Sequence, residues 1–261
     1  MFHPTGRRLS FSVMTLNLRF GLADDGLNSW YYRQKAYAPL LSAYPNDFFA
    51  FQEANQFQVD FLAAQLPDYR HIGVSHPTPG NWQHNVIFHH RRWRCLSADH
   101  FYLSTTPERP SQFSGSRWPR QCTLGIFETS RFRLVVVNTH FDFTEEVQVR
   151  SARLIRRRLR RHAVREPIIL MGDFNTTPHS ACYAEFTVDK GDDGPVFKNV
   201  FNPPFEGTHH GFTGVNRHPP IDWILYRGDL QVQRAVVDTR AFCGIFPSDH
   251  FPVFARFSAG Q

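Results

Sequence analysis

The sequence has few cysteines and no long apolar run. Its four cysteines stand far apart, without the paired spacing of a zinc site or a disulfide framework: Cys95, Cys122, Cys182 and Cys243. We therefore expect reduced thiols and a cytoplasmic location. No stretch approaches the length of about eighteen apolar residues that a membrane-spanning helix needs. Residues 1–10 are too polar for a secretory signal, so we expect none.

Basic residues are concentrated in one segment. The formal charge of the chain is +6, but residues 150–165 hold eight arginines and no acid, so the rest carries −2. Ala152, Ile155, Leu159 and Ala163 recur there at steps of three and four, which predicts an amphipathic helix. Clustered cations on a helix suit a nucleic-acid backbone. They are equally typical of a solvated outer face, so both interpretations stay open.

The composition indicates a folded chain with a large core. Apolar residues make up 41% of it, and its 26 phenylalanines favour thick layers of side chains between sheets. Low-complexity tracts and fixed repeats are missing, and we expect a single domain over residues 1–261. The patterns predict strands at 12–18, 47–52, 85–89, 93–103, 123–128, 132–140, 168–171, 221–226, 230–237 and 251–257, and helices at 30–44, 56–66 and 150–165.

Polar side chains stand where these apolar strands begin or end. The set is Asn17, Glu53, His140, Asp173, Asn175, Asp222, Asp249 and His250. Taken singly, such a residue is more often a cap, a turn or a surface residue than part of an active site. If they converged, the carboxylates and Asn17 would form an oxygen-only ligand set suited to Mg²⁺ or Mn²⁺. Imidazoles beside such a cation could serve phosphoester hydrolysis.

The order of these motifs along the chain carries a resemblance. They are Thr15-Leu16-Asn17, Gln52-Glu53, Asn138-Thr139-His140, Gly172-Asp173-Phe174-Asn175, Ile221-Asp222-Trp223-Ile224 and Ser248-Asp249-His250-Phe251-Pro252. This series resembles the endonuclease/exonuclease/phosphatase superfamily of the DNase I-like fold, across residues 12–257. Residues 16–30 and 207–214 look like its small, single-domain bacterial members. The resemblance implies an α+β fold, a four-layered α/β/β/α sandwich of two mixed sheets.

The resemblance also implies roles for the strand-end residues. Asn17 and Glu53 match the metal ligands, and Asp249 lies close to the metal. Asp173 matches the residue that positions or activates the attacking water, with Asn175 as its partner. His250, held by Asp222, and His140 match the two histidines that act on the phosphate. The expected cofactor is Mg²⁺ or Mn²⁺.

Other positions are less specific. Asn85, Arg120 and His210 are candidate substrate-binding residues, and Arg117 is a further possible phosphate contact. Arg19 stands where the abasic-site endonucleases of this superfamily carry an acid, which argues against a base-excision role. Aromatic residues of the expected loops, Trp82, Phe113 and Trp118, could stack on bases or cover the core.

We therefore expect a metal-dependent phosphoester hydrolase. The leading hypothesis is a phosphodiesterase or nuclease that cuts DNA or RNA by in-line attack of water. The alternative is a phosphatase or phosphodiesterase on small-molecule or lipid-headgroup phosphoesters, since the same residues serve both. A binding protein without activity is a third hypothesis. The sequence argues against it because every residue expected for catalysis is present.

Overall fold

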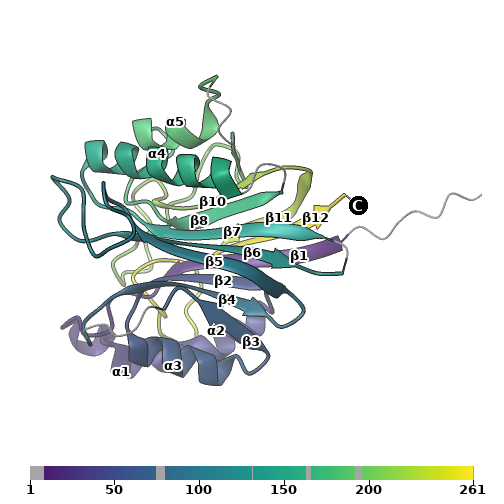
Figure 1. Ribbon diagram of the computed structural model, residues 1–261. Coiled ribbons are helices and arrows are strands. Elements are labelled where there is room, and N and C mark those ends of the chain that lie inside the picture. The colour runs from purple at the N-terminus through teal and green to yellow at the C-terminus, as the bar shows by residue number, and fades with distance from the viewer. Residues whose placement is uncertain (1–8, 75–79, 131, 163–165, 192–195, 261) are drawn as a thin grey trace, which may run out of the picture.

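The computed structural model describes residues 9–74, 80–130, 132–162, 166–191 and 196–260, and Ala163 of the expected helical stripe lies outside them. Two six-stranded sheets pack face to face between outer layers of helices (Figure 1). The fold expected from the sequence, an α+β sandwich of four layers, is confirmed.

The first sheet has the strand order β11-β12-β1-β2-β4-β3. Its strands are β1 (Leu9–Asn17), β2 (Phe48–Ala54), β3 (Tyr69–Ile72), β4 (His84–His90), β11 (Leu230–Val237) and β12 (Val253–Ala259). The second sheet has the order β5-β6-β7-β8-β10-β9. Its strands are β5 (Arg94–Tyr102), β6 (Gln121–Glu128), β7 (Arg133–His140), β8 (Ile168–Asp173), β9 (Lys198–Asn199) and β10 (Asp222–Arg227). In each sheet one central pair is parallel, β1 with β2 and β7 with β8.

Helices cover the outer face of each sheet. Against the first sheet pack α1 (Trp30–Arg33), α2 (Tyr37–Ala43) and α3 (Gln56–Gln65), with short 3₁₀ turns at Gly26–Asn28 and Gln34–Ala36. Against the second sheet pack α4 (Glu145–His162) and α5 (Ala181–Thr187) (Figure 1). The predicted helix 30–44 is therefore broken by a 3₁₀ turn, and the arginine-rich helix begins at Glu145 rather than near Arg150.

The core has three layers, which follow from strand alternation. On β7, Val135 and Val137 point toward α4, whereas Leu134 and Val136 point into the space between the sheets. Ala152, Ile155 and Leu159 of α4 are fully buried, as the helical spacing predicts. Phenylalanine is found in all three layers: Phe174 under α4, Phe127 between the sheets and Phe51 under α3. The expectation that phenylalanines gather between the sheets was therefore wrong in part.

Strand register brings the strand-end residues to one edge of the sandwich. His140 pairs with Asp173 across the parallel strands β7 and β8, and Asp173 pairs with Asp222 across the antiparallel strands β8 and β10. In the first sheet, Asn17 at the end of β1 pairs with Gln52, the residue before Glu53. Rigid strand ends therefore position these side chains.

Gly172 allows β7 and β8 to approach each other at this edge. Its φ is +150°, and a Cβ there would lie 2.0 Å from the carbonyl oxygen of Thr139. We expect Gly172→Ala to destabilise the fold, because overpacking costs about 1–3 kcal/mol and a strained backbone about as much again. Urea unfolding would measure this. Gly80→Ala, where a Cβ meets nothing within 4 Å, is the control, and equal stability of the two variants would contradict the argument.

Two further sequence-based expectations can be compared with the structure. All four cysteines are free, as expected. None of the helices in the described ranges is long and apolar enough to cross a membrane.

Candidate active site

A histidine paired with a carboxylate lies at the centre of the site. Nδ1 of His250 donates a hydrogen bond to Oδ2 of Asp222 at 2.8 Å, and Nε2 lies 3.9 Å from Oδ2 of Asp173. Burial lowers the pKa of His250, but the carboxylates of Asp222, Asp173 and Asp249 outweigh it and raise the pKa to about 10. His250 is therefore an imidazolium at neutral pH, with Nε2–H facing the site.

Asp173 is fully buried between the two histidines. Burial and the neighbouring carboxylate of Asp222 raise its pKa to about 6, although His250 and an amide N–H from Asn17 act in the opposite direction. Asn17 Nδ2 donates to Oδ2 at 3.0 Å, and the backbone N–H of Asn175 donates to Oδ1 at 2.9 Å. A carboxylate with a pKa near neutrality is suited to accept a proton from water.

The second histidine has the opposite charge state. His140 Nε2 lies 3.4 Å from Oδ2 of Asp173 and accepts from Nδ2 of Asn175 at 3.0 Å. Burial, the guanidinium of Arg120 and the charge of His250 hold the pKa of His140 well below its usual range. Arg120 Nη1 lies 3.0 Å from the imidazole. The site therefore presents one charged and one neutral imidazole, the division of roles that acid–base chemistry needs.

Oxygen atoms suited to a divalent cation lie beside these groups. Oε1 of Glu53 accepts from Nδ2 of Asn17 at 3.2 Å and lies 3.9 Å from Nε2 of His140. The Glu53 backbone is strained, with φ of 59°, and the backbone N–H of Phe20 holds Oε2 at 2.7 Å. Strain of this kind is retained where a side chain must be aimed. Asn17, Glu53 and Asp249 carry oxygen donors of the kind that Mg²⁺ or Mn²⁺ prefers. In this structure Asn17 turns Nδ2 toward Glu53, while its Oδ1 accepts from the backbone N–H of Arg19.

Asp249 is flanked by two groups that favour its charged form. Its Oδ2 lies 3.8 Å from Nε of Arg19 and 3.8 Å from Nε2 of His209. Burial raises the pKa of Asp249, but His209, His250 and Arg19 together bring it well below the usual range. Arg19 also binds Asp25 in a bidentate pair at 2.8 and 2.9 Å.

His210, a predicted substrate contact, is placed in the packing behind the site. Its ring stacks on Phe251 at 3.9 Å between centroids, and its Nδ1 accepts from the backbone N–H of Gly214. Of the two neighbouring histidines His209 and His210, the sequence indicated His210, whereas His209 is the one that lies beside the carboxylate of Asp249.

A buried polar bridge behind the site joins the two sheets. Nε2 of Gln52 on β2 donates to Oδ1 of Asn138 on β7 at 2.7 Å. Nδ2 of Asn138 donates to the carbonyl oxygens of Phe51 and Val86, both at 2.9 Å. Gln52 and Asn138 precede site residues in their motifs, but no sequence pattern predicts that they meet. The bridge fixes the spacing between Glu53 and His140, which lie on different sheets.

Arg33 holds the loop after β1 in place through hydrogen bonds, a role that the sequence did not predict. It is fully buried, and its guanidinium donates to the carbonyl oxygens of Leu18 at 2.5 Å, Arg19 at 2.8 Å and Pro247 at 2.8 Å. These carbonyls flank Asn17 and Asp249, so Arg33 ties two parts of the candidate metal centre together. Its helix α1 has four residues, too few for sequence periodicity to show which side faces inward.

We expect Arg33→Met to cost several kcal/mol of stability, because each buried carbonyl left unpaired costs about 1–3 kcal/mol. Thermal unfolding would measure the loss. Arg94→Met is the control, since Arg94 is 74% exposed and pairs with Glu128 on the surface. If the Arg33 variant melted at the same temperature as the control, the hydrogen bonds of Arg33 would not stabilise the fold as argued.

A cleft of about 610 Å³ opens beside Glu53 and His140. This volume lies within the range of about 300–1,000 Å³ that is typical of small-ligand sites. Arg117, Trp118 and Phe143 form part of its wall, together with the predicted contacts Asn85 and Arg120. Trp118 and Phe143 are each 55% exposed. Asn85 itself is buried, and its Nδ2 donates to the carbonyl oxygen of Gln121.

The two arginines of this wall are oriented by Phe143 and Asp142. The guanidinium of Arg117 lies 5.5 Å from the centre of the Phe143 ring and that of Arg120 lies 5.7 Å from it. The backbone N–H of Arg117 donates to Oδ2 of Asp142 at 2.8 Å. Trp82 also lines the cleft, whereas Phe113 is buried in the core under α4.

Comparison with known proteins places this site in a family. A model of the Endonuclease/Exonuclease/phosphatase family matches residues 14–250, from β1 to His250. The chain belongs to this family. Members of the Endonuclease/Exonuclease/phosphatase family are phosphoester hydrolases, typically dependent on a divalent metal. A search of curated proteins found no match to the chain.

Solved structures of the family superpose over nearly the whole chain. A family protein from Bacteroides thetaiotaomicron is 27% identical, with a TM-score of 0.87, and the match covers 98% of this chain and 100% of that one. A mannosyl-6-phosphatase from the same organism is 26% identical, with a TM-score of 0.84 and coverage of 95% and 99%. TDP2 from D. rerio, solved with a single-strand DNA product, is 16% identical, with a TM-score of 0.74 and coverage of 95% and 98%, and supports the fold alone.

Proposed function

We propose that this chain is a phosphoester hydrolase that depends on Mg²⁺ or Mn²⁺ and acts by in-line attack of water. The observation that carries the proposal is the position of Asp173 between a charged histidine and a neutral one. Its Oδ2 lies 3.4 Å from Nε2 of His140 and 3.9 Å from Nε2 of His250. We further propose that residues 1–261 act as one domain.

Each side chain has a role in this proposal. Asp173 accepts the proton of the attacking water, for which its raised pKa is suited. His250 donates Nε2–H to a phosphoryl oxygen, and Asp222 keeps the ring charged and oriented. Asn175 and His140 orient the phosphate. Arg120 adds positive charge from the wall of the cleft.

Asn17, Glu53 and Asp249 would hold the cation. Bound there, it would neutralise negative charge on a phosphoryl oxygen and so favour attack at phosphorus. The oxygen-only donors favour Mg²⁺ or Mn²⁺ over zinc.

For the substrate, we propose a small phosphoester that carries a ring, such as a sugar phosphate. The cleft beside Glu53 and His140 has a volume of about 610 Å³, and aromatic rings and arginines line it. Arginines suit a phosphate, and the exposed faces of Trp118 and Phe143 suit a sugar ring or a base. The likeness to a mannosyl-6-phosphatase at 26% identity supports this choice.

Nucleic acid is the second candidate substrate. The exposed rings of Trp118 and Phe143 favour it, because bases stack on such platforms. The arginine-rich helix α4 supports it less than its composition suggests. Arg158 pairs with Asp99 at 3.0 Å over the ring of Phe101, and Arg150 lies over Phe113, so part of this charge serves packing.

A substrate panel separates the two candidates. Wild type and His250→Ala would be assayed with Mg²⁺ and with Mn²⁺ on hexose 6-phosphates, p-nitrophenyl phosphate, bis-p-nitrophenyl phosphate, single-stranded and duplex DNA, and RNA. We expect kcat/KM to be highest on a small phosphoester and to be lost in His250→Ala. Faster turnover of nucleic acid would make the chain a nuclease. Turnover that His250→Ala leaves unchanged would reject the proposed centre.

A further inference from the structure

One arginine of the active-site cleft pairs with no carboxylate in the described part of the chain. Three arginines line the cleft: Arg19, Arg117 and Arg120. Arg19 pairs with Asp25 at 2.8 Å, and Nε of Arg120 lies 4.0 Å from Oδ2 of Asp142. Arg117 is exposed, and its guanidinium contacts an aromatic ring instead of an acid. Its charge is therefore available to an anion that enters the cleft.

The backbone of Arg117 is held in place although its side chain is exposed. Asp142 is buried, and its Oδ2 accepts from the backbone N–H of Arg117 at 2.8 Å and from that of Trp118 at 3.3 Å. The same oxygen accepts from Oγ of Ser116 at 3.0 Å. Asp142 stands two residues after His140, which ends β7. This part of the wall is therefore anchored to a strand end of the active site, which lowers the entropy lost on binding.

The ring of Phe143 contacts two guanidiniums of the cleft wall. Those of Arg117 and Arg120 lie 5.5 Å and 5.7 Å from its centre. Arg120 is the one beside the candidate catalytic centre, since its Nη1 lies 3.0 Å from the imidazole of His140. Phe143 itself is largely exposed, so a ring of the substrate can pack against it. A small molecule whose reacting phosphate lies beside Arg120 can therefore place a second group at Arg117.

We propose that Arg117 binds a second phosphate group of the substrate, so that the chain prefers a ring compound with two phosphates, such as a hexose bisphosphate. This inference rests on the proposed hydrolase function and narrows its substrate class. Guanidinium groups match phosphate oxygens in a bidentate manner. The cleft volume of about 610 Å³ accommodates a molecule of this size.

Only the phosphoester beside Arg120 would be hydrolysed. Water supplies OH to its phosphorus and H to the ring oxygen, while the bond between that oxygen and phosphorus breaks. The products are inorganic phosphate and a ring compound that keeps the phosphate bound by Arg117.

Steady-state kinetics with Mg²⁺ on glucose 1,6-bisphosphate, glucose 1-phosphate and glucose 6-phosphate test the proposal. We expect wild type to have its highest kcat/KM on the bisphosphate. In Arg117→Gln, the ratio of kcat/KM on the bisphosphate to that on the better monophosphate should fall at least about tenfold, because a charge-assisted contact is lost. The fall should come mainly from a higher KM for the bisphosphate.

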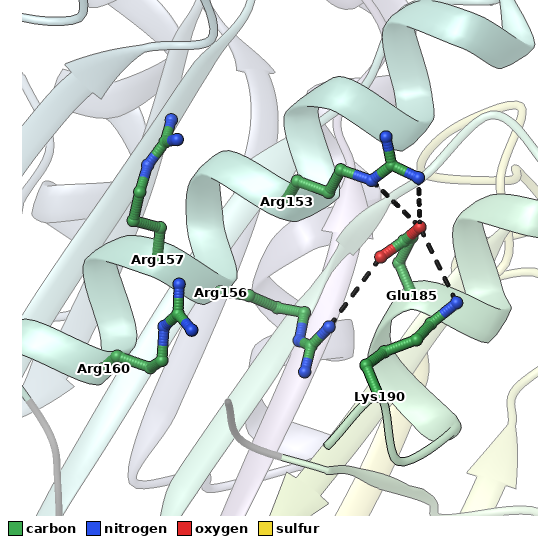
Figure 2. A pocket seen from close by; sticks show the side chains of 6 residues that line it. All are labelled: Arg153, Arg156, Arg157, Arg160, Glu185 and Lys190. Atoms are coloured by element: carbon green, nitrogen blue, oxygen red, sulfur yellow. Dashed lines mark hydrogen bonds and ion pairs between the residues drawn. The ribbon is translucent and has the colours of Figure 1, made fainter. Parts of the chain in front are cut away.

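Arg157→Gln is the matched control. Arg157 is also an exposed arginine, but it belongs to α4 and lines a hollow between α4 and α5 that is separate from the cleft (Figure 2). The ratio should therefore stay at its wild-type value in this variant. An equal fall in Arg157→Gln would indicate diffuse attraction to the positive charge of the chain and would overturn the proposal.

Three further outcomes would overturn it. Wild type could show no preference for the bisphosphate. Arg117→Gln could lower kcat/KM equally on all three compounds, which would place Arg117 at the phosphate that is hydrolysed. Single-stranded DNA could be a better substrate than the bisphosphate, with the advantage lost in Arg117→Gln, which would make Arg117 a nucleic-acid contact.

A binding measurement separates failure of this inference from failure of the proposed function. If wild type hydrolysed none of these compounds, the proposed function would be rejected. Calorimetric titration in EDTA with glucose 1,6-bisphosphate and with glucose 6-phosphate would still test Arg117. Tighter binding of the bisphosphate by wild type and by Arg157→Gln, but not by Arg117→Gln, would support the second phosphate site. Equal binding of the two compounds by wild type would overturn it.

Discussion

Replacement of His250 by alanine is expected to lower kcat by about 10²–10⁴-fold, the usual contribution of a positioned acid or base. The side chain is buried, its pKa is raised to about 10, and its Nε2 faces Asp173. Steady-state kinetics on the best substrate of the panel would measure the loss. His71→Ala is the control, because His71 is an exposed residue of β3, the edge strand of the first sheet.

The pH profile gives the same prediction a second readout. Activity should rise as the pH passes about 6, where Asp173 loses its proton, and fall as it nears 10, where His250 loses its charge. In Asp222→Asn the carboxylate that raises the pKa of His250 is gone. The alkaline fall should therefore move to lower pH. An alkaline limb that stays in place would show that His250 does not act as the charged donor.

The candidate site residues could be predicted from the sequence because they stand at the ends of apolar strands. The strand-end positions of Asn17, His140, Asp173 and Asp222 became one cluster because the registers of β1, β7, β8 and β10 end at the same edge. Register is a property of pairs of strands, and one sequence shows only single strands. The order of the motifs indicated how the strands pair, because it resembles a family whose fold has a fixed strand pairing.

The elements that were missed have weak local signals. Strand β9 has two residues, and β3 has four, of which the two outer side chains are half-buried and the two middle ones exposed. Helix α5 has seven residues and lies in a stretch rich in turn formers, where its apolar face is too short to stand out. Tertiary contacts stabilise α5, such as the edge-to-face contact of Tyr183 with Trp223.

The interactions that hold the site together could not be predicted for a similar reason. Arg33 and the pair Gln52–Asn138 act through partners distant in sequence, at separations of up to 214 residues. Residue type gave a wrong indication for Arg33, because arginine is seldom buried without a carboxylate. Its partners are backbone carbonyls, which no sequence pattern marks.

The second large effect is expected at Glu53. We predict that EDTA abolishes activity and that Mg²⁺ or Mn²⁺ restores it. Glu53→Gln should raise the metal concentration for half-maximal activity by at least about tenfold, because it removes a carboxylate ligand. Titration of activity against metal concentration would measure this. Glu128→Gln is the control, because Glu128 pairs with Arg94 and Arg133 on the surface.

The effect of Glu53 should be on metal affinity more than on folding. The amide of glutamine can still accept from the backbone N–H of Phe20, which holds Oε2 at 2.7 Å, so the strained turn at φ of 59° should survive. The variant should then melt like wild type and regain part of its activity at high metal. If Glu53→Gln kept wild-type metal dependence, the cation would have to bind elsewhere. The cluster of His209, Asp249 and His250, whose ligand atoms lie within 4.8 Å of one another, would become the next candidate.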